Sequence, residues 1–344
     1  MPLRRALSLS AVALLALTSA ACGTEGDDDE PQSDGSLVIY SGRNENLVGP
    51  VLEKLEETTG LDVQVRYGGS SELAAQLLEE GEATEADLFF SQDAGALGAL
   101  AGAGRLEALP ASTTGQVIDG FADPRGTWVA TSARARVVAY DPEQAPEVAE
   151  MTSIDEVLDP AYTGTIGFAP TNASFQSFVT ALRVDKGEDG ARQWLEDFAA
   201  NEPVVYDGNT LVLDAVDSGQ VALGLINHYY WYERVAEKGA DAVNAQIRFL
   251  GSDDPGALIN VAGVGVLAGS GQQEGAVKAI DFLLSPEGQQ YFADETAEYP
   301  VVDGVSSTTH DLVPLADLER SSVDLNSLDS LEQTLALLDQ VGLT

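Results

Sequence analysis

Short apolar runs alternate with segments of helical spacing from residue 36 onward. Residues 37–40 are apolar, and residues 61–67 alternate between apolar and polar positions, so both predict strands. Between them, residues 46–59 carry apolar side chains at the three- and four-residue spacing of one helix face. The order then repeats, with a helix from Ser70, a strand over 86–90 and a helix over 94–103. This order is typical of a parallel sheet covered by helices.

The rest of the chain continues this order and adds two long β runs. Shorter strands are predicted at 163–168, 204–206 and 221–226, with helices over 175–184, 190–199 and 210–218. The long runs, 128–140 and 260–267, are predicted to cross between two α/β lobes. We expect lobe 1 to comprise residues 36–133 and 260–305 and lobe 2 to comprise residues 134–259 and 306–344. From residue 272 onward the chain is expected to be mostly helical.

Ligands of open α/β sheets bind beyond the carboxyl ends of the strands. The cleft between the two lobes is therefore expected to be lined by the residues that follow each strand. These segments are 41–46, 91–93, 171–174, 207–210 and 227–230.

The first residues have the pattern of an export signal. Residues 1–21 combine Arg4 and Arg5 with an apolar run that is too short to span a bilayer. Small residues precede Cys22 as in a bacterial lipoprotein box, which predicts a lipidated cysteine at the mature N-terminus. The alternative is ordinary cleavage after Ala21, with Cys22 a free thiol. Residues 22–35 are polar and acidic, and they are predicted to form a flexible tether.

Composition excludes several classes of function. The 344 residues carry a net charge of −39, which argues against binding to nucleic acid and favours a soluble monomer. One cysteine and two histidines exclude a disulfide framework, a zinc finger and a Cys-His nucleophile pair. No phosphate-binding loop and no set of catalytic acid, base or nucleophile emerges, so we do not expect an enzyme.

Several motifs resemble the periplasmic ferric-ion-binding proteins of ABC importers, the bacterial transferrins. They are IYSGRNENLV from Ile39, EADLFFSQDAG from Glu85, RARVVAYDP from Arg134, FAPTNASFQ from Phe168, LINHYYWY from Leu225 and EYPVVDGV from Glu298. The resemblance implies a periplasmic binding protein fold of type II. It also implies an extracytoplasmic receptor, anchored to the membrane only through lipid, that captures ferric ion between its lobes and delivers it to a permease.

The most specific of these motifs contains a pair of adjacent tyrosines. Tyr229 and Tyr230 follow the predicted strand 221–226, at the edge of the expected cleft. Ferric ion is a hard cation that prefers oxygen ligands, and a bound cation displaces the proton of an acidic ligand. The resemblance implies that these two phenolates bind the metal, and we expect irregular backbone where they converge. The alternative is an aromatic cluster that packs a lobe together with Trp231 and Tyr232.

The remaining ligands depart from the pattern that the family often shows. Asn44 stands where relatives often have a histidine, and Gln92 where they often have a glutamate; both are neutral amides. The resemblance therefore implies an exogenous anion such as carbonate, phosphate or citrate, with Arg43 as the arginine that holds it. Glu45 and Asp93, one residue further along, are possible extra carboxylate ligands.

A second anion-binding surface is predicted across the cleft. Asn172, Ala173 and Ser174 precede a predicted helix, whose N-terminus offers free N–H groups. The resemblance adds Asn209 and Asn227 to this surface. Helix capping by Asn172 or Ser174 is compatible with that role. Tyr140 is a possible further ligand, although packing near a hinge is the better interpretation.

A different ligand in the same fold remains the main alternative. Loss of the histidine and the glutamate is compatible with a phosphonate, a polyamine or another small organic or anionic solute. Glu45 and Asp93 would suit a polyamine.

Overall fold

The computed structural model describes residues 35–344. The predicted signal peptide, Cys22 and nearly all of the tether lie outside these residues. The first lobe begins with three parallel strands, each followed by a helix, as the apolar spacing predicts. These elements are β1 (Leu37–Ser41), α1 (Glu45–Thr59), β2 (Val63–Tyr67), α2 (Ser70–Glu80), β3 (Leu88–Ser91) and α3 (Ala94–Gly102), with the short α4 (Ala111–Thr114) after them.

The second lobe repeats this arrangement around three more parallel strands. Its elements are β5 (Ile166–Phe168), α5 (Ala173–Ala200), β6 (Val204–Val205), α6 (Asn209–Asp217), β7 (Leu223–Asn227), α7 (Tyr229–Lys238) and β8 (Gln246–Arg248). The helices predicted over 175–184 and 190–199 are the two parts of α5, which non-helical backbone at Gly187, with a φ of 71°, separates. Neither α7 nor β8 was predicted from the sequence.

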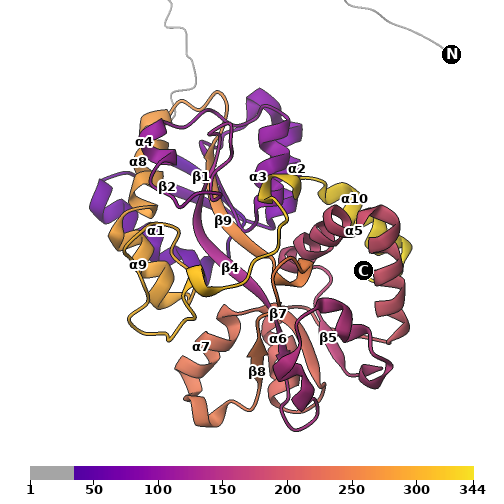
Figure 1. The fold of residues 1–344 in the computed structure, drawn as a ribbon. Helices are drawn as coiled ribbons and strands as arrows, with labels where there is room; N and C mark the ends of the chain where they lie inside the picture. The colour runs from indigo at the N-terminus through magenta and orange to yellow at the C-terminus, as the bar shows by residue number, and fades with distance from the viewer. Residues whose placement is uncertain (1–34) are drawn as a thin grey trace, which may run out of the picture. The chain divides into compact units, whose positions relative to one another are not determined.

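Two long strands connect the lobes, as predicted. They are β4 (Val129–Tyr140) and β9 (Ile259–Val266), which pair antiparallel with each other. Figure 1 shows both strands running between the two groups of elements. At its other end β4 pairs with β7 and β8, while β9 pairs with β3. Glycine is required where they pack closely, because a Cβ atom on Gly263 would lie 2.6 Å from the carbonyl oxygen of Val129.

Each lobe has its own apolar core. One buried cluster includes Leu55 of α1, Phe89 of β3 and Trp128 beside β4. Another includes Phe168 of β5 and Trp194 of α5. Two cores joined by crossing strands confirm the predicted class, an α/β fold with two lobes. The proposed boundaries of lobe 1 and lobe 2 follow these cores only in part, as the C-terminal segment shows.

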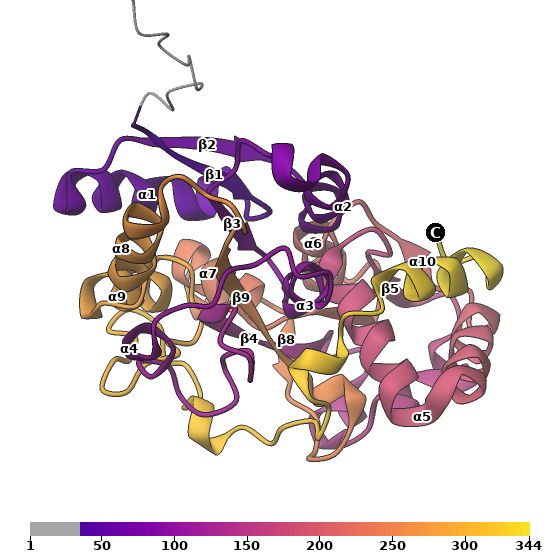
Figure 2. The same ribbon diagram turned by 90° about the horizontal axis from the view of Figure 1, so that it is seen from above.

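The C-terminal segment differs from the prediction of a mostly helical chain. Helices α8 (Gln273–Leu283), α9 (Pro286–Glu295) and α10 (Leu331–Gln340) form, but residues 296–330 contain only short 3₁₀ turns. Leu318, Leu325 and Leu328 pack into the core of the first lobe, so assigning all of residues 306–344 to lobe 2 was wrong. Within this C-terminal segment, helix α10 packs against α5 of the second lobe, as Figure 2 shows. The sparse apolar positions of this segment do not indicate which lobe they cover.

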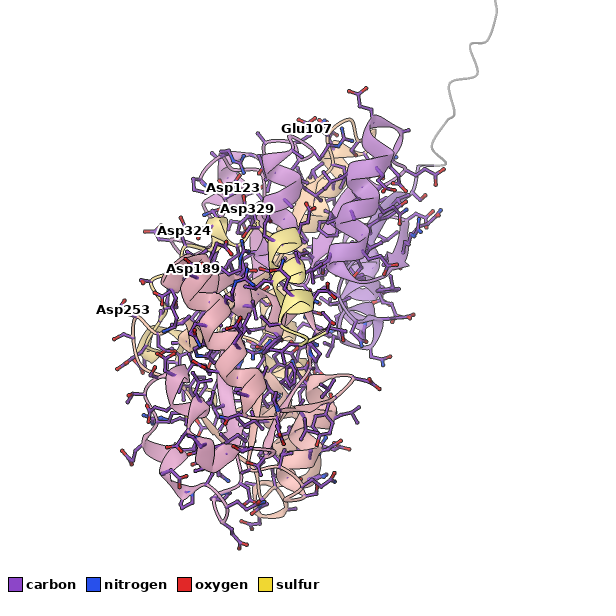
Figure 3. The ribbon with its side chains drawn as sticks, turned by 90° about the vertical axis from the view of Figure 1, so that its right-hand side faces the viewer. Glu107, Asp123, Asp189, Asp253, Asp324 and Asp329 are labelled. Atoms are coloured by element: carbon purple, nitrogen blue, oxygen red, sulfur yellow. The ribbon has the colours of Figure 1, made fainter. Side chains whose placement is uncertain are left out.

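Acidic residues from several parts of the chain lie along one side of the molecule in the view of Figure 3. Figure 3 labels six carboxylates that belong to different segments: Glu107, Asp123, Asp189, Asp253, Asp324 and Asp329. Across the described part of the chain, no helix combines the length and apolar character needed to cross a membrane.

Candidate functional site

A cleft lies where strands of both lobes end and helices begin. Its volume is about 530 Å³. The first lobe lines it with residues from the ends of β1, β2 and β3, and the second lobe with the loop before α5. These residues include Arg43, Asn44, Glu45, Tyr67, Ser70, Glu72, Gln92, Thr171, Asn172, Ala173 and Gln176. The position confirms that both lobes contribute post-strand residues to one cleft.

Tyr229 and Tyr230 lie beyond this lining, in the first turn of α7. Tyr229 is buried and Tyr230 is partly buried. Their ring centroids are 4.2 Å apart, with an angle of 31° between the planes. The expectation of irregular backbone was wrong, because His228 is already helical and α7 begins at Tyr229. Neighbouring side chains diverge much less on a helix than on a strand. Both rings therefore lie on one side of α7 without an irregular turn.

Burial keeps the Tyr229 phenol protonated. Its pKa is raised well above 10, first by burial and then by the charge of Tyr230, while Arg134 opposes the rise. At neutral pH this phenol therefore needs a bound cation before it gives up its proton.

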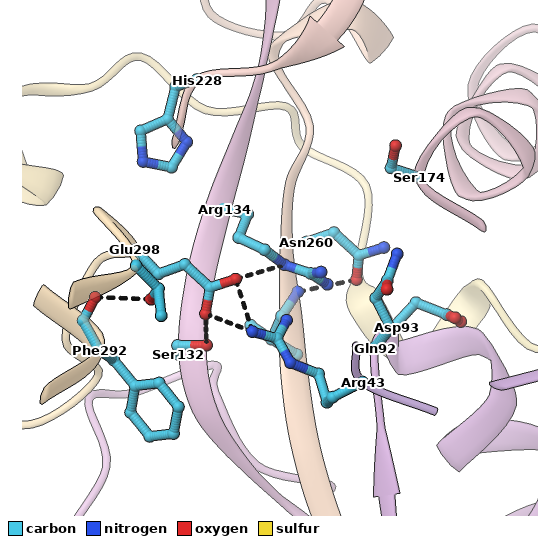
Figure 4. A network of polar contacts seen from close by, with 12 residues as sticks. Arg43, Gln92, Asp93, Ser132, Arg134, Ser174, His228, Asn260, Phe292 and Glu298 are labelled. Atoms are coloured by element: carbon cyan, nitrogen blue, oxygen red, sulfur yellow. Dashed lines mark hydrogen bonds and ion pairs between the residues drawn. The ribbon is translucent and has the colours of Figure 1, made fainter. Parts of the chain in front are cut away.

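Arg43, the predicted anion-binding arginine, is engaged in an ion pair. Its Nη2 atom donates to both carboxylate oxygens of Glu298, at 2.9 and 3.0 Å, and Ser132 donates to the same carboxylate (Figure 4). Burial lowers the pKa of Arg43, but Glu298 outweighs that effect and the pKa is raised. The positive charge of Arg43 is thus already balanced.

Two other arginines are buried nearby, and of these Arg134 has a carboxylate within ion-pair distance. Arg134 is 2% exposed, and its Nε and Nη1 atoms make no hydrogen bond; Nε is 4.0 Å from Glu298. Arg136 donates to Ser174 at 3.2 Å, and burial lowers its pKa to about 10 while Tyr230 and Tyr229 oppose that shift. Among the ion pairs of residues 35–344, none includes Arg136. Both arginines were missed as site residues, although their i, i+2 spacing in a β run places them on one face.

The predicted anion-binding residues of the second lobe do come together. Ser174 accepts hydrogen bonds from Arg136 and from Asn209, at 3.2 and 3.1 Å, and donates to Asn172 at 2.7 Å. Asn209 is 1% exposed, and its Oδ1 atom has no partner. Asn227 ends β7 opposite Arg136 in the strand register, and Ala173 begins α5. The helix N-termini of α5 and α6 therefore meet beside a buried guanidinium.

The candidates of the first lobe are mainly helix caps. Asn44 is exposed and caps α1, while Glu45 is exposed at the start of that helix. Gln92 is partly buried and lines the cleft. Asp93 caps α3 by accepting from Ala96 at 3.0 Å; its Oδ2 atom is buried without a partner, and burial raises its pKa.

Tyr140 is not near the tyrosine pair. It pairs with Leu223 at the far end of the β4–β7 ladder from Asn227, and its ring belongs to the core of the second lobe. This placement favours the packing interpretation of Tyr140 over a role as a further ligand.

His228 is a buried structural residue. Its Nδ1 atom accepts from the N–H of Ala135 at 3.2 Å, so the proton of the neutral ring is on Nε2. The ring stacks on Tyr299 with centroids 4.5 Å apart. Burial lowers the pKa of His228 to about 3.

This buried histidine predicts that the protein is sensitive to acid. An unfolded histidine takes up a proton below about pH 6.5, but native His228 does not until about pH 3. The unfolded state then binds more protons, so the unfolding free energy falls between pH 6.5 and 3 by at most about 1.4 kcal/mol per pH unit from this group. Urea unfolding at several pH values from 7 to 4.5 measures the unfolding free energy. This free energy should fall less steeply with falling pH in His228→Asn, which keeps an acceptor for Ala135. An equally steep fall in both proteins would refute the low pKa of His228.

Comparison with known proteins agrees with this geometry. Residues 83–322 match the model of a family described as bacterial extracellular solute-binding protein. The chain belongs to this family. It is 35% identical over 311 residues to the major ferric iron-binding protein of *Neisseria meningitidis* serogroup A, covering 89% of this chain and 93% of the relative.

Solved structures place this solute-binding protein in the predicted fold. Iron-bound HitA from *Pseudomonas aeruginosa* is 34% identical and superposes with a TM-score of 0.83, over 89% of this chain and 99% of that one. A *Trichodesmium* protein solved with iron and citrate is 26% identical, with a TM-score of 0.76, over 90% of this chain and all of that one. The resemblance predicted from the motifs is confirmed, as is the type II fold.

Proposed function

We propose that this solute-binding protein captures ferric ion through Tyr229 and Tyr230 and delivers it to the permease of an ABC importer. The observation that carries the proposal is the pair of phenols at the start of α7, with Arg43, Arg134 and Arg136 electrostatically coupled to them. Names of the relatives support iron as the cargo.

The chemistry of the pair suits a trivalent cation. Phenolate oxygens are hard ligands, and two of them would cancel two of the three charges of ferric ion. Neighbouring guanidinium groups lower the free energy of the phenolate forms. The bound metal displaces protons that burial otherwise holds in place, so iron should be released as the pH falls.

An anion would complete the site beside Arg136. The buried guanidinium of Arg136 forms no ion pair within residues 35–344, and such a group is costly unless an anion neutralises it. Ser174, Asn209 and the N-terminus of α5 would supply the other contacts. Carbonate, phosphate or citrate each fits this chemistry, and citrate accompanies iron in the *Trichodesmium* relative. We therefore propose Arg136 as an anion-binding arm beside the predicted Arg43.

Replacing Arg136 with glutamine tests this anion site. We expect Arg136→Gln to weaken ferric binding by at least about tenfold, a loss typical of removing a group that supports metal ligands. Iron bound at equilibrium should be measured by dialysis with bicarbonate, phosphate or citrate present. Arg192→Gln is the matched control, because Arg192 carries the same charge but bonds only Gln340 in a solvent-exposed contact. Equal affinities of the two variants would refute a role for Arg136.

Delivery would depend on closure of the lobes around the cargo. We propose that the protein works outside the cytoplasm as a monomer, tethered by lipid at Cys22, and that it is not an enzyme. Residues 36–133 and 134–259 would form the main bodies of the two lobes. A thermal-shift screen with ferric ion, phosphonates and polyamines tests the cargo. Stabilisation by an organic solute without iron would overturn the proposal.

A further inference from the structure

One carboxylate lies a single helical turn from the tyrosine pair. Glu233 follows Tyr229 by four residues and Tyr230 by three on α7. Residues at these spacings lie on one face of a helix, and their side chains lean toward its N-terminus. The Glu233 side chain is therefore directed over the turn that carries both phenols.

The surroundings of Glu233 leave one of its oxygens without a partner. Its Oε1 atom is buried and makes no hydrogen bond. The charged groups that act on it are Glu298 and Arg43, and Arg43 forms its ion pair with Glu298 rather than with Glu233. Burial raises the pKa of Glu233 to about 7, with Glu298 adding to the rise and Arg43 opposing it.

The next turn of the same helix provides a contrast. Glu237 has a side chain that is 74% exposed and lies 3.7 Å from Arg234. An exposed glutamate with a nearby cation is ordinary, whereas a buried carboxylate oxygen without a donor is costly. Glu233 is partly buried, and its buried oxygen thus has no compensating partner among residues 35–344.

We propose that Glu233 is a third protein ligand of the ferric ion held by Tyr229 and Tyr230. This inference rests on the proposed function. Its carboxylate would supply the charged oxygen that the neutral Asn44 and Gln92 cannot. Two phenolates and one carboxylate match the three charges of the cation, and all three ligands come from two adjacent turns of α7.

Glu233→Gln tests this assignment against the matched control Glu237→Gln. Both variants remove one negative charge from α7, but only the first removes the proposed ligand. Iron-free proteins are titrated with ferric ion in bicarbonate, the tyrosinate-to-iron charge-transfer band is recorded, and affinity is measured by competition with citrate. Melting of the iron-free forms is measured alongside. Tyr229→Phe/Tyr230→Phe reports separately on the proposed function.

We expect Glu233→Gln to keep the band but shift it to longer wavelength, because iron with less anionic ligation is a stronger electron acceptor. Its affinity should fall at least about tenfold, while Glu237→Gln matches the wild type. If Glu233→Gln keeps the band position and the iron affinity of the wild type, the assignment is overturned. It is also overturned if the variant only loses stability in the iron-free form, because that would indicate that Glu233 pairs with Arg43. No band in the wild type would instead overturn the proposed function and this inference with it.

If Glu233→Gln does not fold, Glu233→Asp is the second variant, because it keeps the charge with shorter reach. It should shift the band similarly, and an unshifted band would refute the ligand role.

Discussion

Tyr229→Phe/Tyr230→Phe is expected to abolish ferric binding, and each single replacement should weaken it by more than about 100-fold. That figure exceeds what is typical for groups that only support metal ligands. Each change removes one oxygen and leaves the ring in place, so burial of Tyr229 and the ring contact at 4.2 Å should persist. Equilibrium dialysis with ferric ion and bicarbonate measures the loss.

Tyr232→Phe is the matched control for this experiment. Tyr232 lies on the same helix, is 8% exposed and packs against Trp231. It should bind iron as the wild type does. Iron affinity that is unchanged in the double variant, or lost equally in Tyr232→Phe, would contradict the proposed role of the pair.

The second large effect concerns stability. Glu298→Gln should lower the unfolding free energy by about 3–5 kcal/mol, because it leaves buried Arg43 without its countercharge. The side chains of Arg43 and Glu298 are 1% and 0% exposed. Arg134, 4.0 Å from Glu298, would lose its nearest carboxylate as well. Chemical denaturation of the iron-free protein measures the change.

Two further variants separate the ion pair from a general effect of substitution. Arg43→Met/Glu298→Leu removes both charges and should cost less than Glu298→Gln alone. Glu188→Gln breaks a pair with Arg183 in which the glutamate is 64% exposed, and its cost should stay within about 1 kcal/mol. A Glu298→Gln effect as small as that of Glu188→Gln would show that the buried pair is not needed for stability.

Local pattern predicted much of the fold. Alternation and helical spacing placed β1 to α3 within a few residues, and the two long β runs proved to be β4 and β9. The packing of residues 296–330 could not be predicted in this way, because their leucines are buried only by contact with the first lobe. The predicted break between two helices is present within α5, where Gly187 adopts a positive φ and non-helical backbone.

The site was predicted where a motif or a post-strand position carried the signal. Ser174 and Asn209 were found in this way, and they contact each other. The ion pair of Arg43 was not predicted, because its partner, Glu298, is 255 residues away in the chain. Buried polar atoms without a hydrogen bond, such as Nε of Arg134 and Oε1 of Glu233, are a property of the folded protein that spacing alone does not reveal.

The visible spectrum of the wild-type protein tests the central claim most directly. Ferric ion with bicarbonate, or ferric citrate, is added to the iron-free protein, and absorbance is followed to saturation. A tyrosinate-to-iron band that saturates at one ferric ion per chain is the predicted result. No band with any of these anions would contradict ferric binding through Tyr229 and Tyr230.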